Sequence, residues 1–170
     1  MDMKTLRKRC AARIHDLPIP IPFDTQIFAS SLADRRGRPI VLCPMALRGE
    51  SFGAWIAELS VDVVFYEERA APLHQRHIIL HELGHILCDH EGLDDTDVAA
   101  LLSGADPSDE GLRAPRGTRY TDAEEQEAEM IATLILTRIS GAHANTAAPD
   151  AHVADTLRLL DSLEGLNDGG

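Results

Sequence analysis

The chain has 170 residues, of which 44% are hydrophobic and 26% charged, so it is long enough to bury one domain-sized core. Its net charge of -12 argues against nucleic acid as a direct ligand, and no apolar run approaches the roughly 20 residues that cross a bilayer. Three scattered cysteines without a CxxC pair, and basic N-terminal residues that no apolar stretch follows, favour a reducing cytoplasm over secretion.

The N-terminal part, residues 1–37, is expected to form a helix and a proline-rich extended segment. We expect a short helix over residues 2–15, after which three prolines at alternate positions exclude helix. A further helix is expected over Asp24–Ala33, followed by a turn that ends at Gly37.

The next part favours β-structure. Three short runs are rich in β-branched or aromatic side chains, namely Pro39–Cys43, Phe52–Leu59 and Val61–Tyr66. They predict a small and mainly antiparallel sheet. We interpret the last run as an edge strand, to which an extended peptide could be added.

The sequence HELGH at residues 81–85 is an HExxH pattern on a segment that is expected to be helical. Residues four apart lie on one face of a helix, so His81 and His85 can hold one metal ion together. Neutral imidazoles suit zinc, and two of them leave positions for a third ligand and a water. Glu82 lies beside that face, where its carboxylate can act as the general base toward this water. The pattern predicts metal-assisted hydrolysis.

The helix around this pattern is expected to begin near Pro72 and to end at Gly92. Residues 91–120 are rich in Asp, Gly and Pro, and we expect an irregular connection with one helical patch, Asp94–Leu102. A last amphipathic helix is expected over Asp150–Leu163.

A second long helix is predicted to begin after Thr121, whose spacing to Glu124 is that of a capping box, and to run to Ser140, with Gly141 closing it. At the preceding loop end, Arg119 or Tyr120 could stabilise an oxyanion.

The third metal ligand is expected from this acidic helix. Glu125 lies on a stripe with Ala128 and Ala132, and two alanines would let the helix approach the HExxH helix closely. Glu127 lies at the other edge of the apolar stripe and stays open as an alternative. Glu129, one turn after Glu125, is expected to accept the free N–H of a ligand histidine.

The two segments together, HELGHIL at residues 81–87 and EQEAEMIATLIL at residues 125–136, resemble the ImmA/IrrE family of bacterial metallopeptidases. The second motif of that family reads approximately ExxA(N/D)xFAxxLL(M/L)P. The resemblance covers about residues 38–140, with Ile131 where the family has Phe and Thr137 where it has Pro. It implies that Glu125 is the third zinc ligand, and it puts Glu129 at the Asn/Asp position.

The resemblance also implies a biology, because members of the family are often paired with a helix-turn-helix repressor that some of them cleave. We therefore expect an α+β, zincin-like fold in which a small sheet packs on the HExxH helix and a ligand-bearing helix lies behind it. Residues 38–140 would form the zinc metallopeptidase domain, with residues 141–170 packed on it. The expected function is a cytoplasmic zinc endopeptidase that acts on a separate repressor protein, with no nucleic acid or membrane as a partner. The alternative is a metal-containing module that sequesters its partner without cleaving it.

Overall fold

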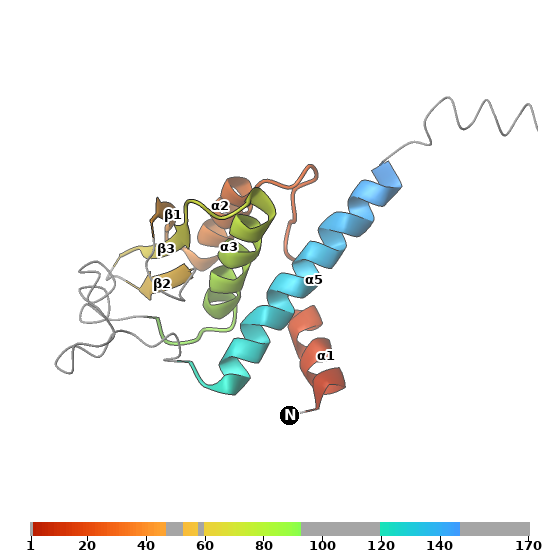
Figure 1. Ribbon diagram of the computed structural model, residues 1–170. Coiled ribbons are helices and arrows are strands. Elements are labelled where there is room, and N and C mark those ends of the chain that lie inside the picture. The colour runs from red at the N-terminus through yellow and green to blue at the C-terminus, as the bar shows by residue number, and fades with distance from the viewer. Residues whose placement is uncertain (1, 47–52, 58–59, 93–119, 147–170) are drawn as a thin grey trace, which may run out of the picture.

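The computed structural model describes residues 2–46, 53–57, 60–92 and 120–146 (Figure 1). Within these ranges the fold is α+β, and its elements are α1 (Met3–Arg13), α2 (Thr25–Arg36), β1 (Ile40–Met45), β2 (Gly53–Ala57), β3 (Asp62–Glu67), α3 (Pro72–Leu87) and α5 (Asp122–Thr146). The helices predicted over Asp94–Leu102 and Asp150–Leu163 lie outside the described residues, as does Arg119.

The sheet has the strand order β1-β3-β2, with β1 parallel and β2 antiparallel to β3. The predicted mainly antiparallel sheet is wrong, because β3 returns between the two earlier strands and pairs in parallel with β1. The interpretation of Val61–Tyr66 as an edge strand is wrong for the same reason. A near-continuous apolar run is typical of a strand that is covered on both faces, and Val64 in the centre of β3 is fully buried.

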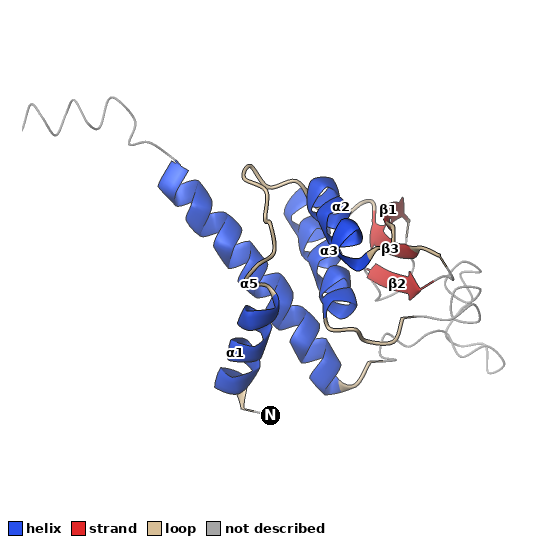
Figure 2. Ribbon diagram, turned by 180° about the vertical axis from the view of Figure 1, so that it is seen from behind, coloured by secondary structure: helices blue, strands red, loops and turns tan. Residues whose placement is uncertain are grey.

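The elements form layers, with α3 between the sheet and α5 (Figures 1 and 2). α2 packs on β1 and α3, and α1 packs on α5. One hydrophobic core joins all of these layers, and its largest fully buried apolar side chains include Leu6, Phe28, Val64, Leu80, Leu83, Ile86, Ile131 and Ile135. Among the described residues, no helix has the length and apolarity that crossing a membrane requires.

Side chains cap the starts of α2 and α5, and the cap of α5 was predicted. Asp24 accepts the Ile27 backbone N–H at 2.8 Å and starts α2. The capping box of α5 is confirmed, because Glu124 Oε2 accepts the Thr121 N–H at 2.7 Å and Thr121 Oγ1 accepts the Glu124 N–H at 3.3 Å. Pro72 occupies the first turn of α3, as expected.

Three helix ends differ from the prediction. α2 continues to Arg36, and Gly37 ends it with a φ of 64°. α3 ends at Leu87 rather than at Gly92, while α5 runs through Gly141 to Thr146. Glycine commonly ends a helix by adopting the left-handed conformation, and of the described glycines only Gly37 does so.

Two arginines from other helices cap the C-terminus of α3. Arg13 of α1 donates to the Leu87 carbonyl at 2.8 Å, and Arg36 of α2 donates to the Ile86 carbonyl at 3.0 Å. Both also pair with Asp89, at 3.8 and 3.1 Å. Cationic groups at this end also interact favourably with the helix dipole.

Asp62 on β3 is fully buried and ties β2 to the rest of the fold. Its Oδ1 accepts the Trp55 indole N–H at 3.1 Å and lies 3.0 Å from Arg38 Nε, and its Oδ2 lies 3.7 Å from Arg36 Nε. This carboxylate fixes the strand that runs beside the site described below.

We expect Asp62→Ala to lower the free energy of unfolding by about 3 kcal/mol, because it removes the buried carboxylate that the Trp55 N–H and two guanidinium groups share. Chemical denaturation measures the change. The matched control is Asp34→Ala on the exposed side of α2, which should stay within about 0.5 kcal/mol of the wild type. Equal effects of the two substitutions would contradict this role of Asp62.

Candidate metal centre

His81 and His85 lie one turn apart on α3 and point to the same place. Their Nε2 atoms are 3.1 Å apart. His85 is fully buried, whereas the side chain of His81 is 23% exposed. Leu80 and Leu83 form the apolar side of α3 and are fully buried in the core. The two imidazoles lie on another side of the helix, which faces α5.

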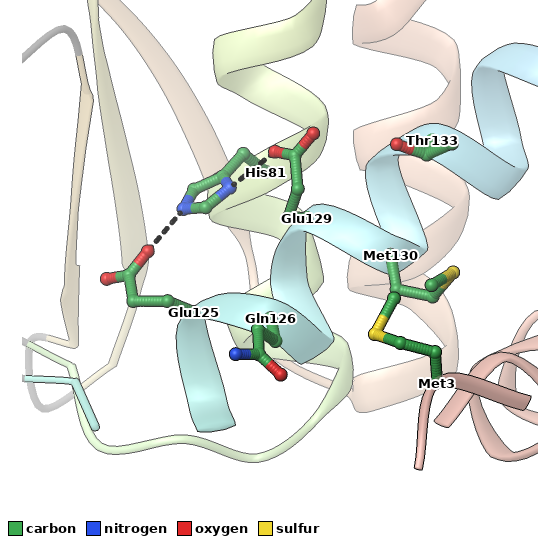
Figure 3. A pocket seen from close by; sticks show the side chains of 7 residues that line it. All are labelled: Met3, His81, Glu125, Gln126, Glu129, Met130 and Thr133. Carbon is green, nitrogen blue, oxygen red and sulfur yellow. Dashed lines mark ion pairs between the residues drawn. The ribbon is translucent and has the colours of Figure 1, made fainter. Parts of the chain in front are cut away.

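Glu125 of α5 completes a group of three possible ligands. Its Oε2 lies 3.3 Å from His81 Nε2, and single ligand atoms of His81, His85 and Glu125 all lie within 4.8 Å of one another. Figure 3 shows the contact between His81 and Glu125 as a dashed line. Glu127, the alternative left open by the sequence, instead forms an ion pair with Arg9 of α1.

The two helices meet at their backbones. A Cβ atom added to Gly84 would lie 2.9 Å from both Cα and the carbonyl oxygen of Ala128, so any side chain at this position would push α5 away. Ala128 and Ala132 are fully buried, in keeping with the close approach that the alanine stripe predicted. The part played by Gly84 was missed, although a glycine inside a helix is the signal that could have revealed it.

The second nitrogen of His81 has its own acidic neighbour. Glu129 Oε2 lies 3.5 Å from His81 Nδ1 (Figure 3). The same oxygen lies 2.9 Å from His77 Nε2. Partial burial raises the pKa of Glu129, but the contacts with the two histidines outweigh it and hold the pKa below its ordinary value. A carboxylate in this place orients an imidazole so that Nε2 is free to bind a metal.

Glu82 is 7% exposed and lies against β2. Gly53 leaves room for it, since a Cβ there would come within 2.8 Å of Glu82 Oε1. Burial, and then the charge of Glu125, raise the pKa of Glu82 to about 8, and a hydrogen bond from the Trp55 backbone acts in the opposite direction. A buried carboxyl group next to a candidate metal centre is therefore tuned toward neutral pH.

His85 is held in its neutral form. Burial, followed by the nearby His81 and His90, lowers the pKa of His85 to about 3. The ring of Tyr120 stacks on it, with centroids 3.6 Å apart and planes inclined by 22°. Tyr120, one of two residues expected to stabilise an oxyanion, therefore covers the face of a candidate ligand.

The donor set fits a divalent cation such as zinc. Two imidazole nitrogens and a carboxylate oxygen are a ligand set of catalytic zinc sites. Burial also raises the pKa of Glu125, and the charge of Glu125 raises that of Glu82. A cation bound by Glu125 would relieve the cost of holding these two acidic groups in a partly buried space.

An open pocket of about 510 Å³ adjoins His81 and Glu125, two of the three candidate ligands. Side chains of His81, Glu125 and Glu129 line one part of it, and Met3, Gln126, Met130 and Thr133 line the remainder (Figure 3). Met3 belongs to α1, so the N-terminal helix forms part of the wall.

An HExxH helix that packs on a small sheet, with an acidic helix that places a third candidate ligand beside it, defines a metallopeptidase-like centre. The family model of the IrrE N-terminal-like domain matches residues 33–144, and the chain belongs to the ImmA/IrrE metallopeptidase family. All three candidate ligands lie inside the matched range, whereas α1 lies before it. A comparison with curated proteins finds no match.

We expect Gly84→Ala to weaken zinc binding by at least about tenfold, since separating α3 from α5 moves Glu125 away from the histidines. It should also lower the free energy of unfolding by roughly 1–3 kcal/mol through overpacking. Competition with a chelator measures the affinity. Gly141→Ala on α5 is the matched control, because a Cβ there meets nothing within 4 Å, and it should stabilise the helix by roughly 0.5–1 kcal/mol. Unchanged zinc binding in Gly84→Ala would show that the close contact between α3 and α5 is not needed for the metal site.

In the metal-free protein, Glu82 makes stability depend on pH. Its folded-state pKa of about 8 lies above the ordinary 4.5, so its contribution is complete below pH 4.5 and is lost as pH rises through 8. Glu82→Gln does not titrate, so its stability relative to wild type should rise between pH 5 and 8, by at most about 1.4 kcal/mol per pH unit. The titration of His85 is common to both proteins and cancels. Chemical denaturation in the presence of a chelator measures this difference in the free energy of unfolding. A difference that stays constant between pH 5 and 8 would contradict the raised pKa of Glu82.

Proposed function

We propose that the protein is a zinc-dependent endopeptidase, with the metal held by His81, His85 and Glu125. The observation that carries the proposal is the convergence of two Nε2 atoms and a carboxylate oxygen beside a buried glutamate, in a member of a metallopeptidase family. Bound zinc would polarise the scissile carbonyl and lower the pKa of the attacking water.

Glu82 is the proposed general base and then the general acid. Its carboxylate would accept a proton from the attacking water and deliver it to the amine that leaves. Its raised pKa supports both roles, because a group that titrates near neutral pH can gain and lose a proton readily. The Trp55 backbone hydrogen bond holds the carboxyl group in place between the two steps.

The substrate is proposed to be an extended peptide segment of a protein. Among the described strands, β2 lies at one edge of the sheet and contacts Glu82, whereas β3 is paired on both sides. β2 is therefore the strand that could add a peptide across the site. The pocket beside His81 would take a side chain of that peptide, and Met3 and Met130 offer flexible apolar surface for it.

A separate helix-turn-helix repressor is the proposed natural substrate. Family membership supports this proposal. The net charge of -12 supports it as well, because DNA-binding proteins carry basic surfaces that an acidic partner attracts.

The experiment that tests the proposal compares wild type with Glu82→Gln on a proteome-derived peptide library after zinc loading. Wild type should bind about one zinc per chain and cleave at defined positions, and Glu82→Gln should bind the same zinc while cleavage falls at least about a hundredfold. Glu68→Gln, on the exposed segment after β3, is the matched control and should cleave like wild type.

Cleavage that survives Glu82→Gln would show that this carboxyl group is not the base. A zinc content below about 0.2 per chain after gentle purification would contradict the proposed metal site itself. Stable binding of a repressor without cleavage by the zinc-loaded wild type would instead favour the non-proteolytic module.

A further inference from the structure

The C-terminus of α3 folds His90 back onto His85. Asp89 has a φ of 57°, its N–H donates to the Ile86 carbonyl at 3.2 Å, and the His90 N–H donates to the His85 carbonyl at 3.1 Å. This pair of bonds is the Schellman motif, which usually brings two apolar side chains together. Here it brings together two imidazoles, whose Nδ1 atoms are 2.9 Å apart.

A second contact continues from His90 toward α1. His90 Nε2 lies 3.5 Å from Glu127 Oε2, and the other carboxylate oxygen of Glu127 pairs with the guanidinium of Arg9. The side chains of His90 and Glu127 are 7% and 14% exposed, so water competes little for these contacts. A chain of polar contacts thus runs from His85 through His90 and Glu127 to Arg9.

The positions of the hydrogens along this chain follow from the metal site. His85 Nε2 faces His81 Nε2, so a metal takes that nitrogen and the hydrogen of the neutral ring stays on Nδ1. Because His85 is fully buried, this N–H needs an acceptor from the protein. His90 Nδ1 accepts it, which leaves the hydrogen of His90 on Nε2, facing Glu127. Each contact then has one donor and one acceptor.

We propose that His90 and Glu127 are positioning residues that fix the tautomer and orientation of the metal ligand His85, and that Arg9 of α1 anchors them. The proposal rests on the metal site of the proposed function. It extends that site to a helix that precedes the residues matched by the family model.

A second metal site is the rival explanation of the same cluster, because ligand atoms of Cys88, His90 and Glu127 lie within 4.8 Å of one another. Three observations argue against it. The guanidinium of Arg9 already neutralises the carboxylate of Glu127. Both ring nitrogens of His90 already have partners within the protein. Burial, the largest influence, raises the pKa of the Cys88 thiol to about 11, which disfavours the thiolate that a metal needs.

The test measures zinc affinity by chelator competition in the full chain, together with the visible spectrum of the cobalt-substituted protein and the unfolding midpoint of the metal-free protein. His90→Phe keeps a ring but removes the acceptor, so zinc affinity should fall about 10- to 100-fold and the cobalt spectrum should change. His90→Asn places an oxygen near the Nδ1 position and should lose less than about tenfold. His15→Phe, at an exposed histidine, is the matched control and should bind zinc like wild type.

Zinc affinity of His90→Phe equal to that of wild type would overturn the proposal. If His90→Phe does not fold, or loses metal-free stability in parallel with affinity, Glu127→Gln decides. This variant keeps an acceptor for His90 but loses the ion pair with Arg9. Weaker zinc binding at unchanged metal-free stability would support the positioning role of Glu127, and unchanged zinc binding would overturn it. Two zinc ions per chain, one of them lost in Cys88→Ala, would establish the rival site. Absence of zinc from the wild type would defeat the proposed function itself, which is a distinct result.

Discussion

The backbone contact between α3 and α5 is the constraint on which the metal centre depends. Two histidines at this spacing leave further positions on a metal open, and Glu125 of the neighbouring helix lies beside them. Gly84 and Ala128 let the helices touch closely enough for Glu125 to reach His81. The glycine inside HELGH is therefore as much a part of the site as the residues that bear ligand atoms.

Burial gives the site its chemistry once this distance is set. Burial disfavours the charged form of both His85 and Glu82, so it lowers the pKa of His85 and raises that of Glu82. Both side chains are therefore held in their neutral forms. The sheet contributes through β2, whose Trp55 contacts Glu82 by its backbone and Asp62 by its indole. A fully buried aspartate on the central strand thus holds the residue whose backbone contacts the proposed general base.

Local signals in the sequence predicted the helix of the HExxH pattern and the capping box at Thr121, since both depend on neighbours within one turn. The strand order could not be predicted, because inserting β3 between β1 and β2 is a long-range choice. The sequence left Glu125 and Glu127 open for a similar reason, because their placement depends on α1: Arg9 pairs with Glu127, and Glu125 lies beside the two histidines. The contact of His90 with His85 was not predicted, because an aspartate, not the usual glycine, makes the left-handed turn before His90.

The two arginines on the last carbonyls of α3 have a consequence for metal affinity. His85 lies in the final turn of its helix, the part that ordinarily frays in solution. Arg13 and Arg36 hold that turn from α1 and α2, so the conformational entropy of His85 is lost when the chain folds and not when the ion arrives. Helices that contribute no candidate ligand thus preorganise this part of the site before any ion binds.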